Sequence, residues 1–199
     1  MNLPNSITLA RLALTAVYVL MASLSGAGAA WISLGAFVIA AATDWLDGYL
    51  ARKMNLVTAL GKLLDPLVDK ILVCAAFVHL SMESMCPMWM TILIIGREFL
   101  VTGLRQIAVE RGVVIAADRW GKAKTIAQMI AVIAKTIAQM IAVIIALLLL
   151  AGRHGSSEFF WASWLSALLP IILWLAVFLT CLSGWNYLRA ARPLFARSE

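Results

Sequence analysis

Four aspartates lie within 26 residues of a chain that is otherwise strongly apolar: Asp44, Asp47, Asp65 and Asp69. The whole chain of 199 residues holds only ten acidic side chains, so this concentration needs a physical reason. Asp44 and Asp47 are three residues apart, which places both on one face of a helix. The second pair is four residues apart and shares a face in the same way. The spacing therefore predicts two acidic helix faces close together in the sequence.

Carboxylates that face each other repel unless a cation lies between them. Ligation by carboxylate oxygens alone suits a hard cation, so we expect Mg²⁺ or Mn²⁺. Four such groups can hold two ions, the usual arrangement for clamping phosphate oxygens during a displacement. Any one aspartate could instead cap a helix or pair with Arg52, Lys62 or Lys70. That structural interpretation accounts poorly for all four together.

Two glycines and one arginine accompany the aspartates. Gly48 and Gly61 remove side chains next to the carboxylates and leave room for a flat or bulky group. Arg52 offers a planar fork that suits a phosphate. These residues extend the prediction from a metal site to a site for a phosphate-bearing ligand.

The composition is that of a membrane protein. Hydrophobic residues make up 63% of the chain and charged residues 13%, whereas soluble domains are about 25% charged. We therefore expect a single membrane domain over residues 1–199. The net charge of +6 is more typical of cytoplasmic loops than of nucleic-acid binding, so no nucleic-acid partner is expected. The three cysteines lack the spacing of metal ligands.

Six apolar segments predict an all-α bundle of six transmembrane helices. We expect a polar cap at residues 4–6, Pro66 in the first turn of the third helix, and basic loops at residues 52–55 and 111–124. Pro170 is expected to kink the sixth helix. The predicted helices cover residues 7–24, 29–50, 63–80, 88–109, 125–150 and 159–188.

The distribution of basic residues predicts the orientation in the membrane. The loops after the second and fourth predicted helices are rich in Lys and Arg, whereas the opposite loops contain only Arg153. Cytoplasmic loops carry this excess of positive charge. We therefore expect both termini, and the acidic stretch, at the cytoplasmic side of the membrane.

An exact tandem repeat of eleven residues, AKTIAQMIAVI, occupies residues 123–133 and 134–144 within the fifth predicted helix. With both copies, residues 125–150 span about 39 Å as a helix, which exceeds an apolar core of roughly 30 Å. We expect the first copy to protrude into the cytoplasm or to bulge, because Lys135 would otherwise lie deep in lipid.

The acidic stretch fits the pattern D-x2-D-G-x2-A-R-x8-G-x3-D-x3-D at every position, with Ala51 at the alanine. This pattern resembles the signature of the CDP-alcohol phosphatidyltransferase family, and the six-helix plan extends the resemblance over most of the chain. The resemblance implies transfer of a phosphatidyl group from a CDP-lipid to an alcohol, with CMP leaving. It implies that the four aspartates bind the metals and that Asp69 also serves as the base for the acceptor hydroxyl.

The resemblance further implies that the CDP-lipid contacts a small set of residues near the motif. The N-terminal stretch of residues 2–11 is similar to that of phosphatidylglycerophosphate synthases in the family. The expected CDP-lipid contacts are Asn5, Thr8, Gly48, Ala51, Arg52 and Gly61.

Charges in the fourth predicted helix and in the loop after it bear on the acceptor alcohol. Arg97 and Glu98 lie in the middle of a predicted span, where charges are functional candidates. Arg105, Lys122 and Lys124 add positive charge suited to an anionic acceptor such as sn-glycerol 3-phosphate. The lysines could instead be only cytoplasmic anchors.

The sequence around these charges points to the same acceptor. The stretches at residues 96–105 and 121–125 are similar to those of phosphatidylglycerophosphate synthases. We therefore expect CDP-diacylglycerol and sn-glycerol 3-phosphate to give phosphatidylglycerophosphate and CMP. If the second repeat copy takes the native place, Lys135 replaces Lys124, Ile133 stands where Lys122 should be, and activity is weakened.

Other interpretations remain open. The acceptor could be inositol phosphate, serine or another lipid, and an acidic cation site could instead belong to a membrane carrier. No inverted repeat of broken helices supports a carrier. The resemblance implies a homodimer in the bacterial inner membrane, with the active site facing the cytoplasm and contacts to membrane lipid.

Overall fold

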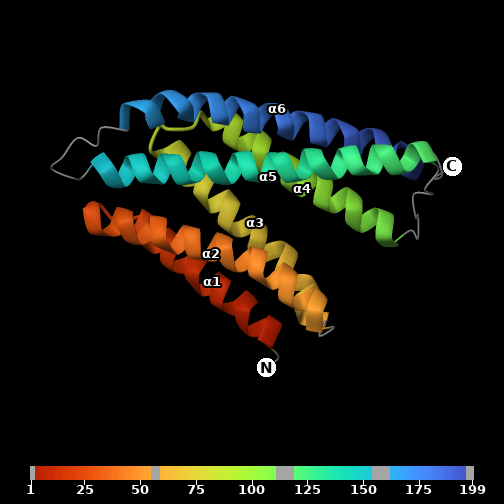
Figure 1. The fold of residues 1–199 in the computed structure, drawn as a ribbon, viewed down its shortest axis with the longest axis horizontal. Coiled ribbons are helices and arrows are strands. Elements are labelled where there is room, and N and C mark those ends of the chain that lie inside the picture. The colour runs from red at the N-terminus through yellow and green to blue at the C-terminus, as the bar shows by residue number, and fades with distance from the viewer. Residues whose placement is uncertain (1–2, 55–58, 111–118, 154–161, 196–199) are drawn as a thin grey trace. The chain divides into compact units, whose positions relative to one another are not determined.

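The computed structural model describes the backbone of residues 3–54, 59–110, 119–153 and 162–195. Side chains are described for residues 9–43, 70–104, 106–107, 133–153 and 162–189. The described backbone is α-helical apart from short turns and contains no strand, which confirms the all-α prediction. Six helices are labelled in Figure 1: α1 (Leu3–Ala22), α2 (Ala27–Met54), α3 (Ala59–Met82), α4 (Met88–Glu110), α5 (Arg119–Arg153) and α6 (Ala162–Phe195).

The chain divides into two compact units. The first unit comprises residues 1–85 and 143–168, and the second comprises residues 86–142 and 169–199. The first unit thus contains α1, α2 and α3, and the second contains α4 with most of α5 and α6.

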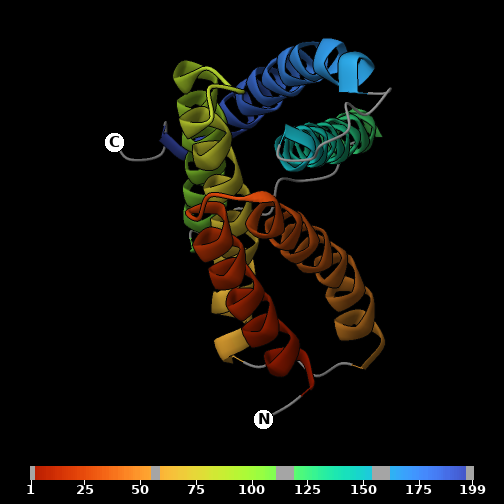
Figure 2. The same ribbon diagram turned by 90° about the vertical axis from the view of Figure 1, so that its left-hand side faces the viewer.

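The first unit is built on the hairpin of α1 and α2. Both helices contact each other and α3. Because α1 and α2 are antiparallel, the start of α1 lies at the same end of the unit as the end of α2 and the start of α3 (Figure 2). Tyr18 is fully buried. Its ring lies 5.7 Å from that of Phe37, and its hydroxyl is 3.0 Å from Nδ1 of His79.

Two short turns end the helices of this unit. Gly26 has φ 127°, a conformation that strongly favours glycine, in the predicted turn between α1 and α2. Ser84, with φ 58°, follows α3. The amide of Met85 bonds to the carbonyl of Leu80 at 2.9 Å, and the amide of Ser84 to that of Ser81 at 3.2 Å. These two bonds define a Schellman motif, in which the left-handed position is usually glycine.

Helices α1 and α2 are longer than predicted. α1 begins at Leu3, so the expected cap at residues 4–6 is wrong and these residues form the first turn, where proline is tolerated. α2 continues to Met54. The predicted basic loop at residues 52–55 is therefore wrong for Arg52 to Met54, whose basic side chains favour a helix C-terminus.

The starts of α3 and α5 also differ from the prediction. α3 begins at Ala59, so Pro66 is in the interior and not in the first turn. Proline has no N–H and cannot bond to the carbonyl four residues earlier. α5 begins at Arg119, which shows that Lys122 and Lys124 are helical and not in a loop. α6 extends to Phe195.

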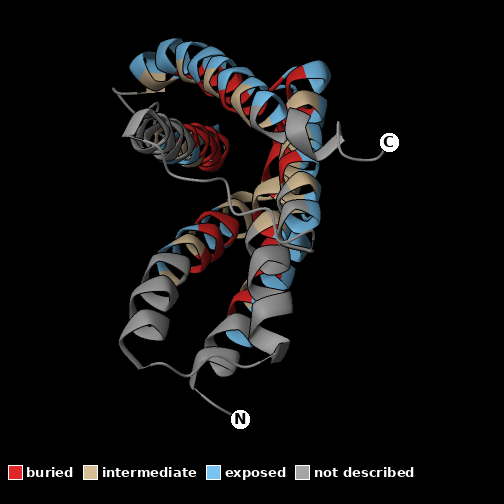
Figure 3. Cartoon of the chain, turned by 90° about the vertical axis from the view of Figure 1, so that its right-hand side faces the viewer, coloured by how far each residue is buried: buried red, intermediate tan, exposed pale blue. Residues whose placement is uncertain are grey.

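Long apolar helices give the chain a membrane character. Within the described residues, Ile133–Arg153 and Ala162–Arg189 are long and apolar enough to cross a membrane, with mean hydropathies of 2.4 and 2.5. Figure 3 shows buried and exposed positions on different sides of the helices. Many exposed positions carry large apolar side chains, such as Trp164 and Ile171. Such a surface is suited to lipid tails.

Candidate functional site

The acidic motif lies on two adjoining helices of the first unit. Positions 44, 47, 48, 51 and 52 belong to the C-terminal half of α2, and positions 61, 65 and 69 belong to the N-terminal half of α3. A connection of four residues joins the two helices, which also contact each other. The side chains of Asp44, Asp47, Asp65 and Asp69 lie outside the described residues, as do those of Ala51 and Arg52.

The first turns of α1 lie at the end of the unit where α2 ends and α3 begins (Figure 2). The predicted lipid-binding residues Asn5 and Thr8 belong to these turns, and their side chains are also outside the described part. The backbone thus brings three separate stretches that the sequence singled out to one end of one unit.

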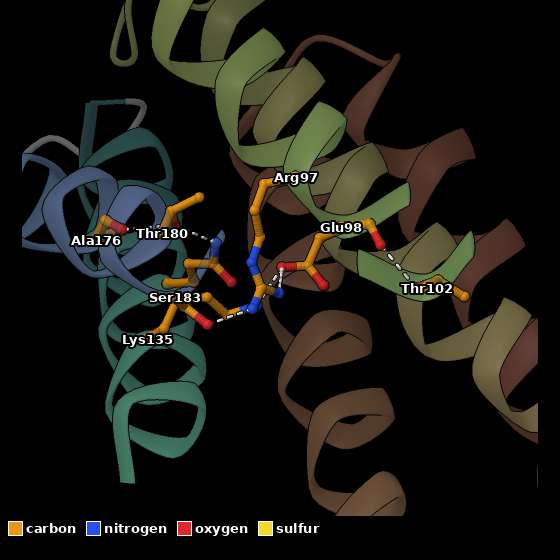
Figure 4. Close-up of polar contacts among 8 residues, drawn as sticks. Arg97, Glu98, Thr102, Lys135, Ala176, Thr180 and Ser183 are labelled. Atoms are coloured by element: carbon orange, nitrogen blue, oxygen red, sulfur yellow. Dashed lines mark hydrogen bonds and ion pairs between the residues drawn. The ribbon is translucent and has the colours of Figure 1, made fainter. Parts of the chain in front are cut away.

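A charged cluster is described in the second unit. Arg97 and Glu98 lie near the middle of α4. Nη1 of Arg97 donates to Oε1 of Glu98 at 3.1 Å. The same oxygen accepts from Nζ of Lys135 on α5. Figure 4 shows both cations meeting this carboxylate.

All three charged side chains are largely removed from the surface. Their exposed fractions are 9% for Arg97, 15% for Glu98 and 4% for Lys135. Among the described side chains of this unit, these two cations and one carboxylate sum to one net positive charge. A charge that is shielded from water interacts strongly with a ligand of opposite sign, so the cluster is electrostatically suited to an anion.

Helix α6 contributes further contacts to Arg97. Nη2 of Arg97 donates to Oγ of Ser183, and the guanidinium carbon lies 5.8 Å from the centre of the Tyr187 ring. A Cβ at Gly184 would lie 3.3 Å from Cγ of Arg97. Gly184 therefore lets the arginine stem cross close to the α6 backbone.

A second polar contact joins α5 to α6 within this unit. Nε2 of Gln139 donates to Oγ1 of Thr180 at 3.4 Å, and the Thr180 hydroxyl donates to the carbonyl of Ala176 at 2.6 Å. Gln139 is four residues after Lys135, so both side chains leave α5 on one face. This face of α5 thereby contacts α4 through Lys135 and α6 through Gln139.

The predicted acceptor-binding residues are partly described. The structure brings Arg97 and Lys135 together on one carboxylate, whereas the side chains of Arg105, Lys122 and Lys124 lie outside the described residues. Sequence reasoning missed Ser183, Gly184 and Gln139. A serine and a glycine that interrupt an apolar helix were the available signal for the first two.

The structure contradicts one of the two outcomes that were predicted for the repeat, protrusion or a bulge. α5 is a continuous α-helix of 35 residues, so the predicted bulge is wrong. Lys135 is buried against Glu98, and its charge is therefore compensated within the protein. Protrusion of the first copy stays a prediction, supported by a helix length of about 52 Å.

The long apolar helices are consistent with a membrane protein, and the chain carries a helical acidic motif and a buried charged cluster. The chain matches the CDP-alcohol phosphatidyltransferase family model over residues 1–182 and belongs to that family.

Three relatives carry the same name, CDP-diacylglycerol–glycerol-3-phosphate 3-phosphatidyltransferase. The chain is 41% identical to the relative from Bacillus subtilis (strain 168), with 94% of this chain and 93% of the relative covered. It is 37% identical to the relative from Rickettsia bellii, with 98% and 97% covered. It is 33% identical to the relative from Cereibacter sphaeroides, with 96% of each chain covered.

Proposed function

We propose that this chain transfers the phosphatidyl group of CDP-diacylglycerol to sn-glycerol 3-phosphate, which yields phosphatidylglycerophosphate and CMP. The chain is a phosphatidyltransferase by family, and relatives of nearly the same length are named for this reaction. The observation that carries the proposal is the complete eight-position motif on the adjoining helices α2 and α3.

The donor set of the motif fits divalent metal ions. Asp44, Asp47, Asp65 and Asp69 supply only carboxylate oxygens, which Mg²⁺ and Mn²⁺ prefer. Bound there, two ions would neutralise the pyrophosphate and the charge that develops on the departing CMP. The family resemblance supports these four residues as the ligands.

The residues of the chain have separate tasks in this mechanism. Asp69 accepts the proton of the acceptor hydroxyl, which makes the oxygen a better nucleophile. Arg52 binds a phosphate of the nucleotide through its planar fork, and Gly48 and Gly61 leave space for the nucleotide. Asn5, Thr8 and Ala51 complete the proposed contacts to the CDP-lipid.

The acceptor phosphate is assigned to the cationic residues of α4 and α5. Arg97 and Lys135 share one carboxylate, so the described side chains there sum to one net positive charge. A positive charge favours an anionic acceptor over a neutral one such as serine. On the basis of sequence, Arg105 belongs to the same proposed site. Lys122 and Lys124 belong to it only if the first repeat copy takes the native place, because Lys124 lies about 16 Å from Lys135 along α5.

The proposed setting is the bacterial inner membrane. The basic loops support six spans with both termini and the acidic motif on the cytoplasmic side. In that setting the diacyl tails stay in lipid while the nucleotide and glycerol phosphate arrive from the cytoplasm. The family resemblance supports a homodimer within a single membrane domain.

Release of CMP from CDP-diacylglycerol tests the proposal. We expect the purified chain to release CMP with sn-glycerol 3-phosphate, and much less with serine or inositol phosphate. Chelation of divalent ions should abolish the release, and Asp69→Asn should lower it by at least two orders of magnitude. Glu83→Gln, at an exposed position in the turn between α3 and α4, is the matched control and should leave the release unchanged.

A membrane carrier would release no CMP with any acceptor, so that result contradicts the proposal. Release with inositol phosphate or serine in place of glycerol phosphate would keep the reaction class and reject the acceptor.

A further inference from the structure

One nitrogen of the Arg97 guanidinium group, Nε, is buried and has no hydrogen-bond partner within the described part of the chain. The side chain is 9% exposed, and a buried N–H without a partner is unfavourable by about 1–3 kcal/mol. Native proteins pair nearly all of their buried polar groups, so a buried N–H such as this one is a candidate donor to a ligand, an ion or water.

The other two nitrogens of the guanidinium are held in place. Nη1 donates to Glu98 at 3.1 Å, and Nη2 donates to Ser183. Tyr187 approaches the guanidinium carbon to 5.8 Å with its ring, which adds a cation–π attraction. Contacts on both ends of the fork leave little rotational freedom, so the direction of the Nε–H bond is fixed.

We propose that Ser183, Gly184 and Tyr187 of α6 form a positioning cradle that aims Arg97 at the phosphate group of the acceptor. This inference rests on the proposed function and extends it to three residues that contact Arg97 and not the reacting atoms. The ligand of the cradle is an oxyanion, because an N–H donor on a cation is satisfied most strongly by a charged oxygen.

Helix α6 suits this task for a steric reason. A methyl group at position 184 would lie 3.3 Å from Cγ of Arg97, which is tighter than an ordinary van der Waals contact. A side chain there would require the arginine stem to shift by a few tenths of an ångström, which would disturb its contact with Ser183. The glycine therefore sets the distance at which the serine hydroxyl and the guanidinium meet.

The cradle is tested by the kinetics of variants of the full chain. Ser183→Ala should raise the KM for sn-glycerol 3-phosphate roughly tenfold, because a hydrogen bond to a charged group is lost. The KM for CDP-diacylglycerol should stay within twofold. Ser183→Thr keeps a hydroxyl and should restore most of the affinity.

The other two cradle residues give independent variants. Gly184→Ala should raise the same KM, whereas Gly35→Ala, where a methyl group meets nothing within 4 Å, should not. Tyr187→Leu should raise the KM for sn-glycerol 3-phosphate more than Tyr187→Phe, because phenylalanine keeps the aromatic ring. Ser166→Ala is the matched serine control on α6, since its hydroxyl donates only to its own helix at Ser163.

Calorimetric binding of sn-glycerol 3-phosphate, inorganic phosphate and glycerol separates the two proposals. The cradle is supported if the chain binds sn-glycerol 3-phosphate and inorganic phosphate but not glycerol, and if Ser183→Ala weakens that binding. This support would hold even in a chain that releases no CMP. The absence of CMP release would reject the proposed function alone. Release of CMP with an acceptor KM that is unchanged in Ser183→Ala and Gly184→Ala would overturn the cradle alone. A parallel rise in the KM of both substrates would overturn it too.

Discussion

Lys135, from the second copy of the repeat, forms an ion pair with Glu98 on α4. The first copy offers an identical lysine at position 124. A shift of eleven residues moves a helix by about 16 Å and turns it by only about 20°. Both copies are therefore able, by local chemistry, to occupy the place beside Glu98.

The residues after the repeat determine whether Lys135 or Lys124 lies beside Glu98, and these two alternatives are two registers of α5. If Lys124 took the place beside Glu98, Lys135 would move to the present position of Ala146, which is fully buried. A lysine at an apolar buried position is strongly unfavourable. The observed register instead fills the positions after the repeat with the apolar residues 145–151.

In a chain that lacks residues 134–144, Lys124 is predicted to take the place of Lys135 beside Glu98. In the full chain, Lys135→Met should lower the free energy of unfolding by about 1–3 kcal/mol, because Glu98 loses a partner. Lys124→Met should leave that free energy nearly unchanged. In the shortened chain, Lys124→Met should be the destabilising variant. Unfolding in detergent measures all three.

Activity gives a second readout of the same deletion. In the shortened chain, Lys122 and Lys124 directly precede the apolar part of the helix, so both lysines can reach the proposed acceptor site. The shortened chain should therefore release CMP faster than the full chain. Equal activity of the two chains would show that the duplication is harmless to the acceptor site.

Glu98→Gln is predicted to be more damaging than the loss of either cation. It leaves Arg97 and Lys135 as like charges in a buried place, and removing one partner of a buried ion pair is unfavourable by about 3–5 kcal/mol. Adding Lys135→Met to Glu98→Gln removes the repulsion, so the double variant should be more stable than Glu98→Gln alone. A double variant with the summed loss of both single variants would contradict the shared carboxylate.

The element types were predictable from the sequence and several boundaries were not. Six apolar segments gave six helices, and the turns at Gly26 and Ser84 lie in the intervals between the predicted helices. The helices of the motif and the repeat run further than predicted, because polar and basic residues are good helix formers beyond an apolar span.

The charged cluster was only partly predictable. The mid-helix position marked Arg97 and Glu98, but identical repeat copies gave no local signal to choose between Lys124 and Lys135. Ser183 and Gly184 have little meaning until α6 is placed beside Arg97, because helix-to-helix contacts join residues that are distant in sequence.

Ser84→Gly is predicted to stabilise the protein. Ser84 occupies the left-handed position of the Schellman motif, where a residue with a Cβ is strained and glycine is not. The expected gain is about 0.5–1 kcal/mol, seen as a rise of roughly 1–3 °C in the midpoint of thermal unfolding. Ser81→Gly, in the last turn of α3, is the matched control and should lower the midpoint.

The turn between α3 and α4 is predicted to face away from the cytoplasm. Glu83→Cys, at an exposed position in this turn, should react with a membrane-impermeant maleimide in intact cells. Asn55→Cys, between α2 and α3, should react only after the membrane is opened. Labelling in the reverse order would contradict the proposed sidedness of the acidic motif.

The native Cys86 in the same turn should not obscure this experiment. Burial raises the pKa of its thiol, and a hydrogen bond from Thr91 at 3.5 Å offsets that shift only in part. The thiolate is the reactive form, so a raised pKa keeps Cys86 protonated and slow to react near pH 7. Raising the pH should therefore increase labelling of the unsubstituted chain, and Cys86→Ala should remove that increase.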